Sequence, residues 1–97
     1  MIEIRRMEPR TNMHVYFKTP VVINERRKGK YWVAEFAPTN LYVLEKTIDD
    51  LVITIGEMFD CDYEAYALAD DNTLTEKAKV IKRWFLENTF IKKEETE

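Results

Sequence analysis

The chain has no serine, one cysteine, one histidine and two glycines among its 97 residues. Without serine there can be no serine nucleophile, and a single cysteine cannot form a disulfide within the chain. Two glycines are too few for a glycine-rich phosphate loop. A zinc site needs three or four ligands at short range, and His14 and Cys61 stand far apart without companions. We therefore expect a protein that is not an enzyme and that holds no metal or other cofactor.

Long apolar runs are also missing from the sequence. No stretch approaches the roughly 20 residues that a transmembrane helix requires, and the first ten residues lack the apolar centre of a signal peptide. A small secreted domain would usually carry several cysteines, whereas this chain has only Cys61, which we expect to be a buried or half-buried apolar side chain. These features predict a cytoplasmic protein.

The composition is that of one folded domain. Apolar residues make up 45% of the chain and aromatic residues 12%, which is enough for a core, and 97 residues leave room for a single domain. Residues 1–12 are polar and aperiodic, so we predict a loosely ordered N-terminal arm there. Residues 13–91 then form the α+β domain, and the charged residues 92–97 form a frayed tail.

Charge is distributed unevenly along the chain. The first 30 residues carry eight Lys or Arg and three Glu, a net charge of +5. The remaining residues carry seven Lys or Arg and fifteen Asp or Glu, a net charge of −8. Such a division can give a basic face and an acidic face, or the two halves can neutralise each other in the fold. We favour mutual neutralisation, because runs of charge are usually solvated surface.

Period-two alternation predicts several strands in the first half of the chain. In the strongest of them Trp32, Ala34 and Phe36 share one face, while Tyr31, Val33 and Glu35 share the other. Gly29 lies in a polar run between strands and predicts a hairpin turn, because glycine adopts a positive φ without strain. The predicted strands cover residues 14–18, 21–25, 31–36 and 41–44, with a short additional strand at 2–4.

Two helices follow the strands. Thr47 is a suitable N-cap for the first, with Asp49 and Asp50 beside the positive end of the helix dipole. Thr73 opens the second, with Glu76 three residues later as a capping box. Residues 60–68 fit either helix or strand. The whole pattern predicts an α+β fold, with a three- to four-stranded antiparallel sheet and two amphipathic helices packed on one face.

Several segments together resemble the HicB-like antitoxin family. They are the aromatic-Val-Ala-Glu strand at 31–36, the Pro-containing turn at 38–41, the Thr47 entry into a helix, and residues 64–78, so that the resemblance covers roughly residues 19–90. It implies a partial RNase-H-like fold that forms oligomers and inhibits a small toxin by covering it. No residues are left over for a helix-turn-helix, which implies an inhibitor-only or orphan member.

Two sets of residues are candidates for binding a partner. Aromatic residues anchor protein interfaces, so a protein partner, which the resemblance suggests is a small toxin, would contact Tyr31, Val33 and Tyr42 on the outer face of the sheet. These three residues are equally consistent with an ordinary sheet surface. The alternative is nucleic-acid binding by the basic turn, where phosphate contacts could combine with base stacking. That set consists of Arg26, Arg27, Lys28 and Lys30.

Overall fold

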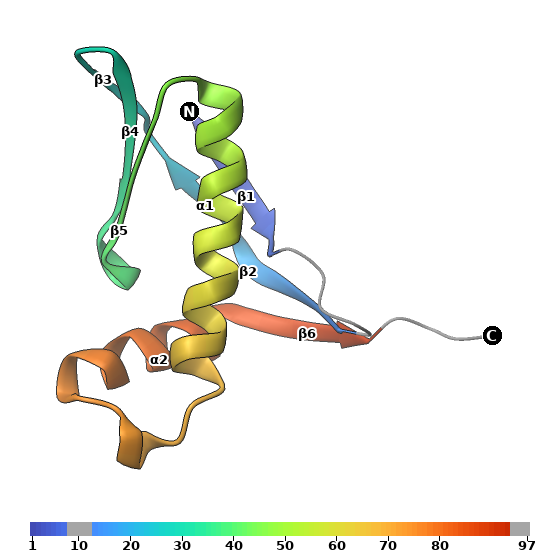
Figure 1. The fold of residues 1–97 in the computed structure, drawn as a ribbon. Coiled ribbons are helices and arrows are strands. Elements are labelled where there is room, and N and C mark those ends of the chain that lie inside the picture. The colour runs from blue at the N-terminus through green and yellow to red at the C-terminus, as the bar shows by residue number, and fades with distance from the viewer. Residues whose placement is uncertain (8–12, 94–97) are drawn as a thin grey trace.

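The computed structural model describes residues 1–7 and 13–93 and shows an α+β fold (Figure 1). Two antiparallel three-stranded sheets have the strand orders β1-β2-β6 and β3-β4-β5. The strands are β1 (Ile2–Arg6), β2 (Met13–Ile23), β3 (Arg26–Lys28), β4 (Tyr31–Phe36), β5 (Leu41–Glu45) and β6 (Thr89–Lys93). The main helices are α1 (Ile48–Asp62) and α2 (Glu76–Asn88). The α+β class is confirmed, whereas two sheets replace the single sheet that we expected.

The sheet β1-β2-β6 contains strands from both ends of the chain. Ile2 and Ile4 alternate with polar residues in β1, and their side chains are buried in the core, as is Met7. The short strand predicted at 2–4 is therefore present and extends to Arg6, so that residues 2–7 belong to the folded sheet and not to a loosely ordered arm. Likewise β6 extends to Lys93, into the segment predicted as a tail. Residues 8–12 and 94–97 lie outside the described residues.

Pro20 marks an irregularity within β2 rather than a break between two strands. The pairing of β1 with β2 moves from Ile4↔Val21 to Arg6↔Tyr16, so that two steps along β1 correspond to five along β2. Proline lacks the N–H that a regular ladder uses, and bulges are where sheets tolerate it. The extra residues let one long strand contact β1 along its second half and β6 along its first half.

In the segment 60–68, which fitted either helix or strand, residues 60–67 are helical and Leu68 is the C-cap. α1 runs to Asp62 and continues into a π-helical turn, η2 (Tyr63–Ala67), which buries Tyr63 and Ala67. At the other end of α1, the hydroxyl of Thr47 accepts a hydrogen bond from the Asp50 amide at 3.1 Å. The predicted N-cap of the first helix is thus confirmed.

The second helix begins two residues later than predicted. Thr73 lies in a short 3-10 turn, η3 (Asp71–Thr73), where its hydroxyl donates a hydrogen bond to the Asp70 carbonyl oxygen at 2.7 Å. Thr75 is the actual N-cap of α2, since its hydroxyl accepts from the Ala78 amide at 3.2 Å. Either threonine could cap a helix by its residue type. The hydroxyl of Thr73 is engaged within the preceding turn, so the helix begins after Thr75.

Phe59 of α1 joins the two sheets and α2 through its ring. α1 packs against β4 and β5 of one sheet and against β1 of the other, and the Phe59 side chain is completely buried. Its ring centroid lies 5.2 Å from that of Phe17 in β2, 5.8 Å from that of Phe36 in β4 and 6.5 Å from that of Phe85 in α2, all edge to face. Such pairs add to the stabilisation that burial already provides.

Replacing Phe59 with Ala should lower the free energy of unfolding by about 3–5 kcal/mol, because it leaves a cavity where the sheets and α2 meet. Phe59→Leu should cost less, since part of the volume is retained. Urea denaturation followed by circular dichroism measures both losses. The matched control is Ile53→Ala on the solvent side of α1, where the side chain is 58% exposed. If Phe59→Ala and Ile53→Ala lowered the free energy of unfolding equally, the central role of Phe59 would be contradicted.

Candidate functional site

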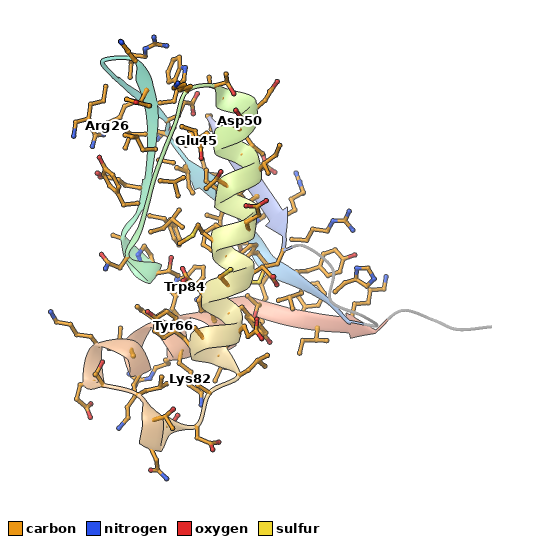
Figure 2. The ribbon with its side chains drawn as sticks, viewed as in Figure 1. Arg26, Glu45, Asp50, Tyr66, Lys82 and Trp84 are labelled. Atoms are coloured by element: carbon orange, nitrogen blue, oxygen red, sulfur yellow. The ribbon has the colours of Figure 1, made fainter. Side chains whose placement is uncertain are left out.

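The sheet β3-β4-β5 has one face turned away from α1. Residues directly opposite on antiparallel strands share a face, and Val33 lies opposite Arg26 and Leu44. Arg26 projects to the side away from α1, whereas Glu45 lies between the sheet and the helix (Figure 2). We call the side away from α1 the outer face. It carries Arg26, Lys28, Tyr31, Val33, Glu35, Tyr42 and Leu44.

Three large apolar side chains on the outer face are exposed to solvent. Tyr31 is 36% exposed, Leu44 39% and Tyr42 50%. Val33 on the central strand is fully buried, yet it is not part of the main core cluster, which contains its neighbour Ala34. Side chains of the outer face itself therefore cover Val33.

The structure places the three predicted contact residues on one face, but only two of them are exposed there. Tyr31 and Tyr42 are exposed there, as predicted, whereas Val33 is buried and cannot touch a partner directly. Leu44, which lies directly opposite Val33 on the edge strand β5, is exposed on the same face. The alternation along β5 would have indicated Leu44, which is two residues from Tyr42.

Two of the four basic residues in the predicted turn are held by the fold itself. The guanidinium of Arg26 forms a 2.8 Å ion pair with Glu35 on the outer face. The Arg27 guanidinium stacks over the Trp32 ring at 5.2 Å on the opposite face and donates a hydrogen bond to the Gly29 carbonyl at 2.9 Å. Gly29 has a φ of +58°, which confirms the predicted turn. Both Lys28 and Lys30 are exposed.

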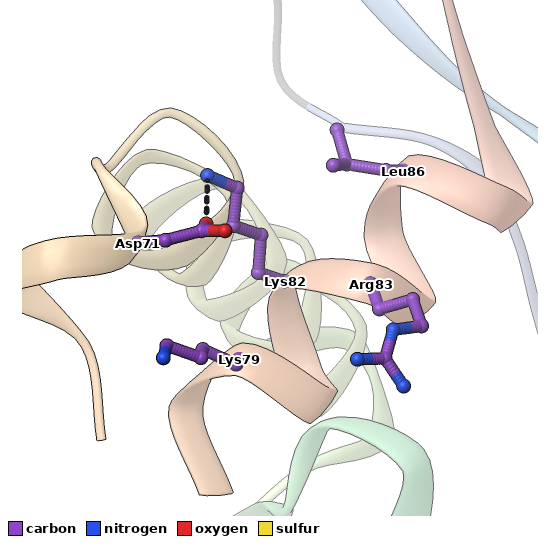
Figure 3. A pocket seen from close by; sticks show the side chains of 5 residues that line it. All are labelled: Asp71, Lys79, Lys82, Arg83 and Leu86. Carbon is purple, nitrogen blue, oxygen red and sulfur yellow. Dashed lines mark hydrogen bonds and ion pairs between the residues drawn. The ribbon is translucent and has the colours of Figure 1, made fainter. Parts of the chain in front are cut away.

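A hollow of about 320 Å³ lies between η3 and α2 (Figure 3). The ammonium of Lys82 donates hydrogen bonds to Asp71 Oδ1 at 2.8 Å and to the Ala69 carbonyl at 2.6 Å, and so ties the loop to α2. The same contact lowers the pKa of the Asp71 carboxyl below its usual value. The lining residues are Asp71, Lys79, Lys82, Arg83 and Leu86.

A second hollow of about 330 Å³ separates α2 from the 3-10 turn η1 (Ala37–Thr39). It is lined by Ala37, Pro38, Asn40, Lys77, Val80 and Ile81. Apart from Lys77 these side chains are uncharged, so the hollow does not gather ionisable groups as a catalytic pocket does. Neither hollow includes a residue of the outer face.

Reactive and metal-binding side chains are dispersed in the part of the chain that the structure describes. There, no three or more His, Cys, Asp or Glu residues come together to hold a metal ion. Cys61 is exposed on α1, so the prediction of a buried or half-buried side chain is wrong: its helical position falls outside the buried stripe of Leu51, Ile55 and Phe59. Among the described residues, no helix is both long and apolar enough to cross a membrane.

Comparison with known proteins gives no assignment. No family model, no curated protein and no solved structure matches the chain.

Replacing Lys82 with Met should return the pKa of Asp71 toward its usual range, because the largest cause of its lowering is the hydrogen bond from Lys82. In the wild-type protein this contact stabilises the fold above the usual pKa of an aspartate, and the stabilisation disappears as the pH falls through the lowered pKa. NMR titration of the Asp71 carboxyl carbon measures the change. Lys77→Met, on another side of α2, should leave the titration unaltered. An Asp71 pKa that is unchanged in the Lys82 variant would refute the assignment.

Proposed function

We propose that the protein is a non-enzymatic protein-interaction module, a HicB-like antitoxin or an orphan relative, that binds a small protein partner through the outer face. The observation that supports this proposal is the exposed cluster of Tyr31, Tyr42 and Leu44 around the buried Val33. The family resemblance, with its partial RNase-H-like arrangement and its small toxin partner, stays a prediction from the sequence.

The chemistry of the outer face suits a protein better than a small molecule. Tyrosine combines a large apolar ring with a hydroxyl that can form a hydrogen bond at the edge of an interface. Tyr31 and Tyr42 stand on β4 and β5, so the hydrogen-bonded sheet holds both in place and little freedom is lost on binding. Small molecules prefer hollows, and the two hollows described above lie away from this face.

Charges at the end of the outer face favour one kind of partner. Arg26 and Glu35 neutralise each other across β3 and β4, whereas Lys28 and Lys30 add exposed positive charge at the turn. A partner with an apolar patch and carboxylates facing this turn would therefore be complementary. Charges at the rim of an interface act mainly on the association rate, which should fall as salt is added.

Nucleic-acid binding is the competing proposal. It has less support because Arg26 is paired with Glu35, and Arg27 is stacked on Trp32, so that binding phosphates would require both guanidinium groups to give up contacts within the fold. Lys28 and Lys30 are left as the two freely exposed cations of the set. The test below separates the two proposals.

Replacing Tyr42 with Ala should weaken capture of the partner by at least about tenfold, which is the usual effect of removing an interface anchor. The measurement uses the tagged chain co-expressed with the product of its neighbouring open reading frame, followed by titration of the purified pair. Leu44→Asp should abolish capture, because it places a charge within the buried centre of the interface. Ile53→Ala, which removes an exposed side chain on α1, is the matched control.

Three results would count against the proposal. One is failure to capture the neighbouring product, and another is capture that Tyr42→Ala and Leu44→Asp leave unchanged. The third is retention of a fluorescent 20-nucleotide RNA or DNA at low salt, with loss of binding on Lys28→Ala and Lys30→Ala. That outcome would favour the nucleic-acid alternative.

A further inference from the structure

The strand β6 forms an open edge of the sheet β1-β2-β6. Its inner side pairs with the first half of β2, and within the described residues no strand lies on its outer side. Figure 1 shows β6 projecting away from the helices. Phe90 is 47% exposed and Ile91 46%. Because adjacent strand residues point to opposite faces, each face of this edge carries one large exposed apolar side chain.

The hydrogen bonds of β2 indicate which amide groups of β6 face outward. The Met7 amide donates to the Val15 carbonyl at 2.9 Å, which directs the polar groups of Val15 toward the β1 side. Polar groups alternate in direction along a strand, so those of Tyr16 face β6, where Tyr16 lies opposite Phe90. It follows that the N–H and C=O of Phe90 face β2, and those of Ile91 face the open edge.

We infer that two copies of the chain join in an antiparallel manner along β6, with Ile91 of each copy on the two-fold axis. In this register the two Ile91 residues exchange both N–H···O=C bonds. Phe90 lies opposite Lys92 of the second copy, and Thr89 lies opposite Lys93. The result is one continuous six-stranded sheet in the order β1-β2-β6-β6-β2-β1.

The charges of β6 favour a second copy in this register. Lysines on an edge strand usually prevent pairing between edges, because like charges meet. With Ile91 on the axis, however, Lys92 faces Phe90 of the other copy rather than another lysine. Each Phe90 ring is already stacked on Tyr16, at 5.5 Å between centroids and 15° between planes. An ammonium over such a ring gains a cation–π contact, and the two-fold axis provides this contact twice.

The shape of the single chain is consistent with assembly along this edge. Its radius of gyration is 14.2 Å and its extents are 43 × 40 × 20 Å. A compact domain of this length would have a radius of gyration of about 12.5 Å. The projecting β6 contributes to this flat and extended form. The interface is small, so the dimer should dissociate on dilution. The dimer interface uses a different surface from the proposed function, because the outer face belongs to the other sheet.

The first test is light scattering after size exclusion over a range of concentrations. The wild-type chain should change from monomer to dimer as its concentration rises, and Ile91→Lys should stay monomeric, because it places two ammonium groups together on the axis. Ile53→Lys adds the same charge at an exposed position on α1 and should keep the dimer. Tyr42→Ala should keep it too. A wild-type chain that is monomeric at every concentration, or an Ile91→Lys variant that still forms a dimer, would overturn the inference.

The second test fixes the register and does not depend on a charged substitution. In a Cys61→Ala background, which removes the exposed native thiol, Ile91→Cys should form a disulfide-linked dimer on mild oxidation. The two Cα atoms of a hydrogen-bonded pair are about 5.5 Å apart, within disulfide range. Lys92→Cys should not cross-link, since its counterpart lies two residues out of register. Cross-linking through position 92 but not 91 would refute this register. A monomer that captures a different protein through Ile91 would refute the second copy as the occupant.

Discussion

The aromatic contacts of Phe59 are the interaction on which the arrangement of this protein depends. One ring from the middle of the chain packs edge to face against rings from β2, β4 and α2. The two sheets share no strand; they touch where β2 approaches β4, and both pack against α1. Without a large, fully buried side chain at this position, the inner faces of both sheets would lose their common partner.

The packing of both sheets against α1 determines which surfaces of the protein remain exposed. Each sheet buries its inner residues, such as Val15 and Ala34, and leaves its other face toward solvent. The outer face of β3-β4-β5 thereby keeps Tyr31, Tyr42 and Leu44 exposed on a rigid, hydrogen-bonded surface. The open edge at β6 arises from the same architecture, because a sheet of three strands does not close on itself as a barrel does.

The basic turn shows how tertiary contacts can redirect residues that look functional in the sequence. Four cations within five residues predict a surface for phosphates. In the fold, however, Arg26 neutralises Glu35 on one face, and Arg27 covers Trp32 on the other. Both contacts come from alternation on β3 and from its register with β4. The charges thus support the hairpin, and the apolar cluster beside them becomes the better candidate for binding.

Local signals in the sequence determined the α+β class, the β4 strand, the Gly29 turn and the Thr47 cap, because each depends on neighbouring residues alone. Only the tertiary structure decided that residues 2–6 and 89–93 flank β2 in a second sheet, since long-range pairing leaves little trace in such short segments. It also decided that Val33 is buried and Leu44 exposed. Alternation assigns a side chain to a face, but the residues on adjacent strands determine how much of it meets solvent.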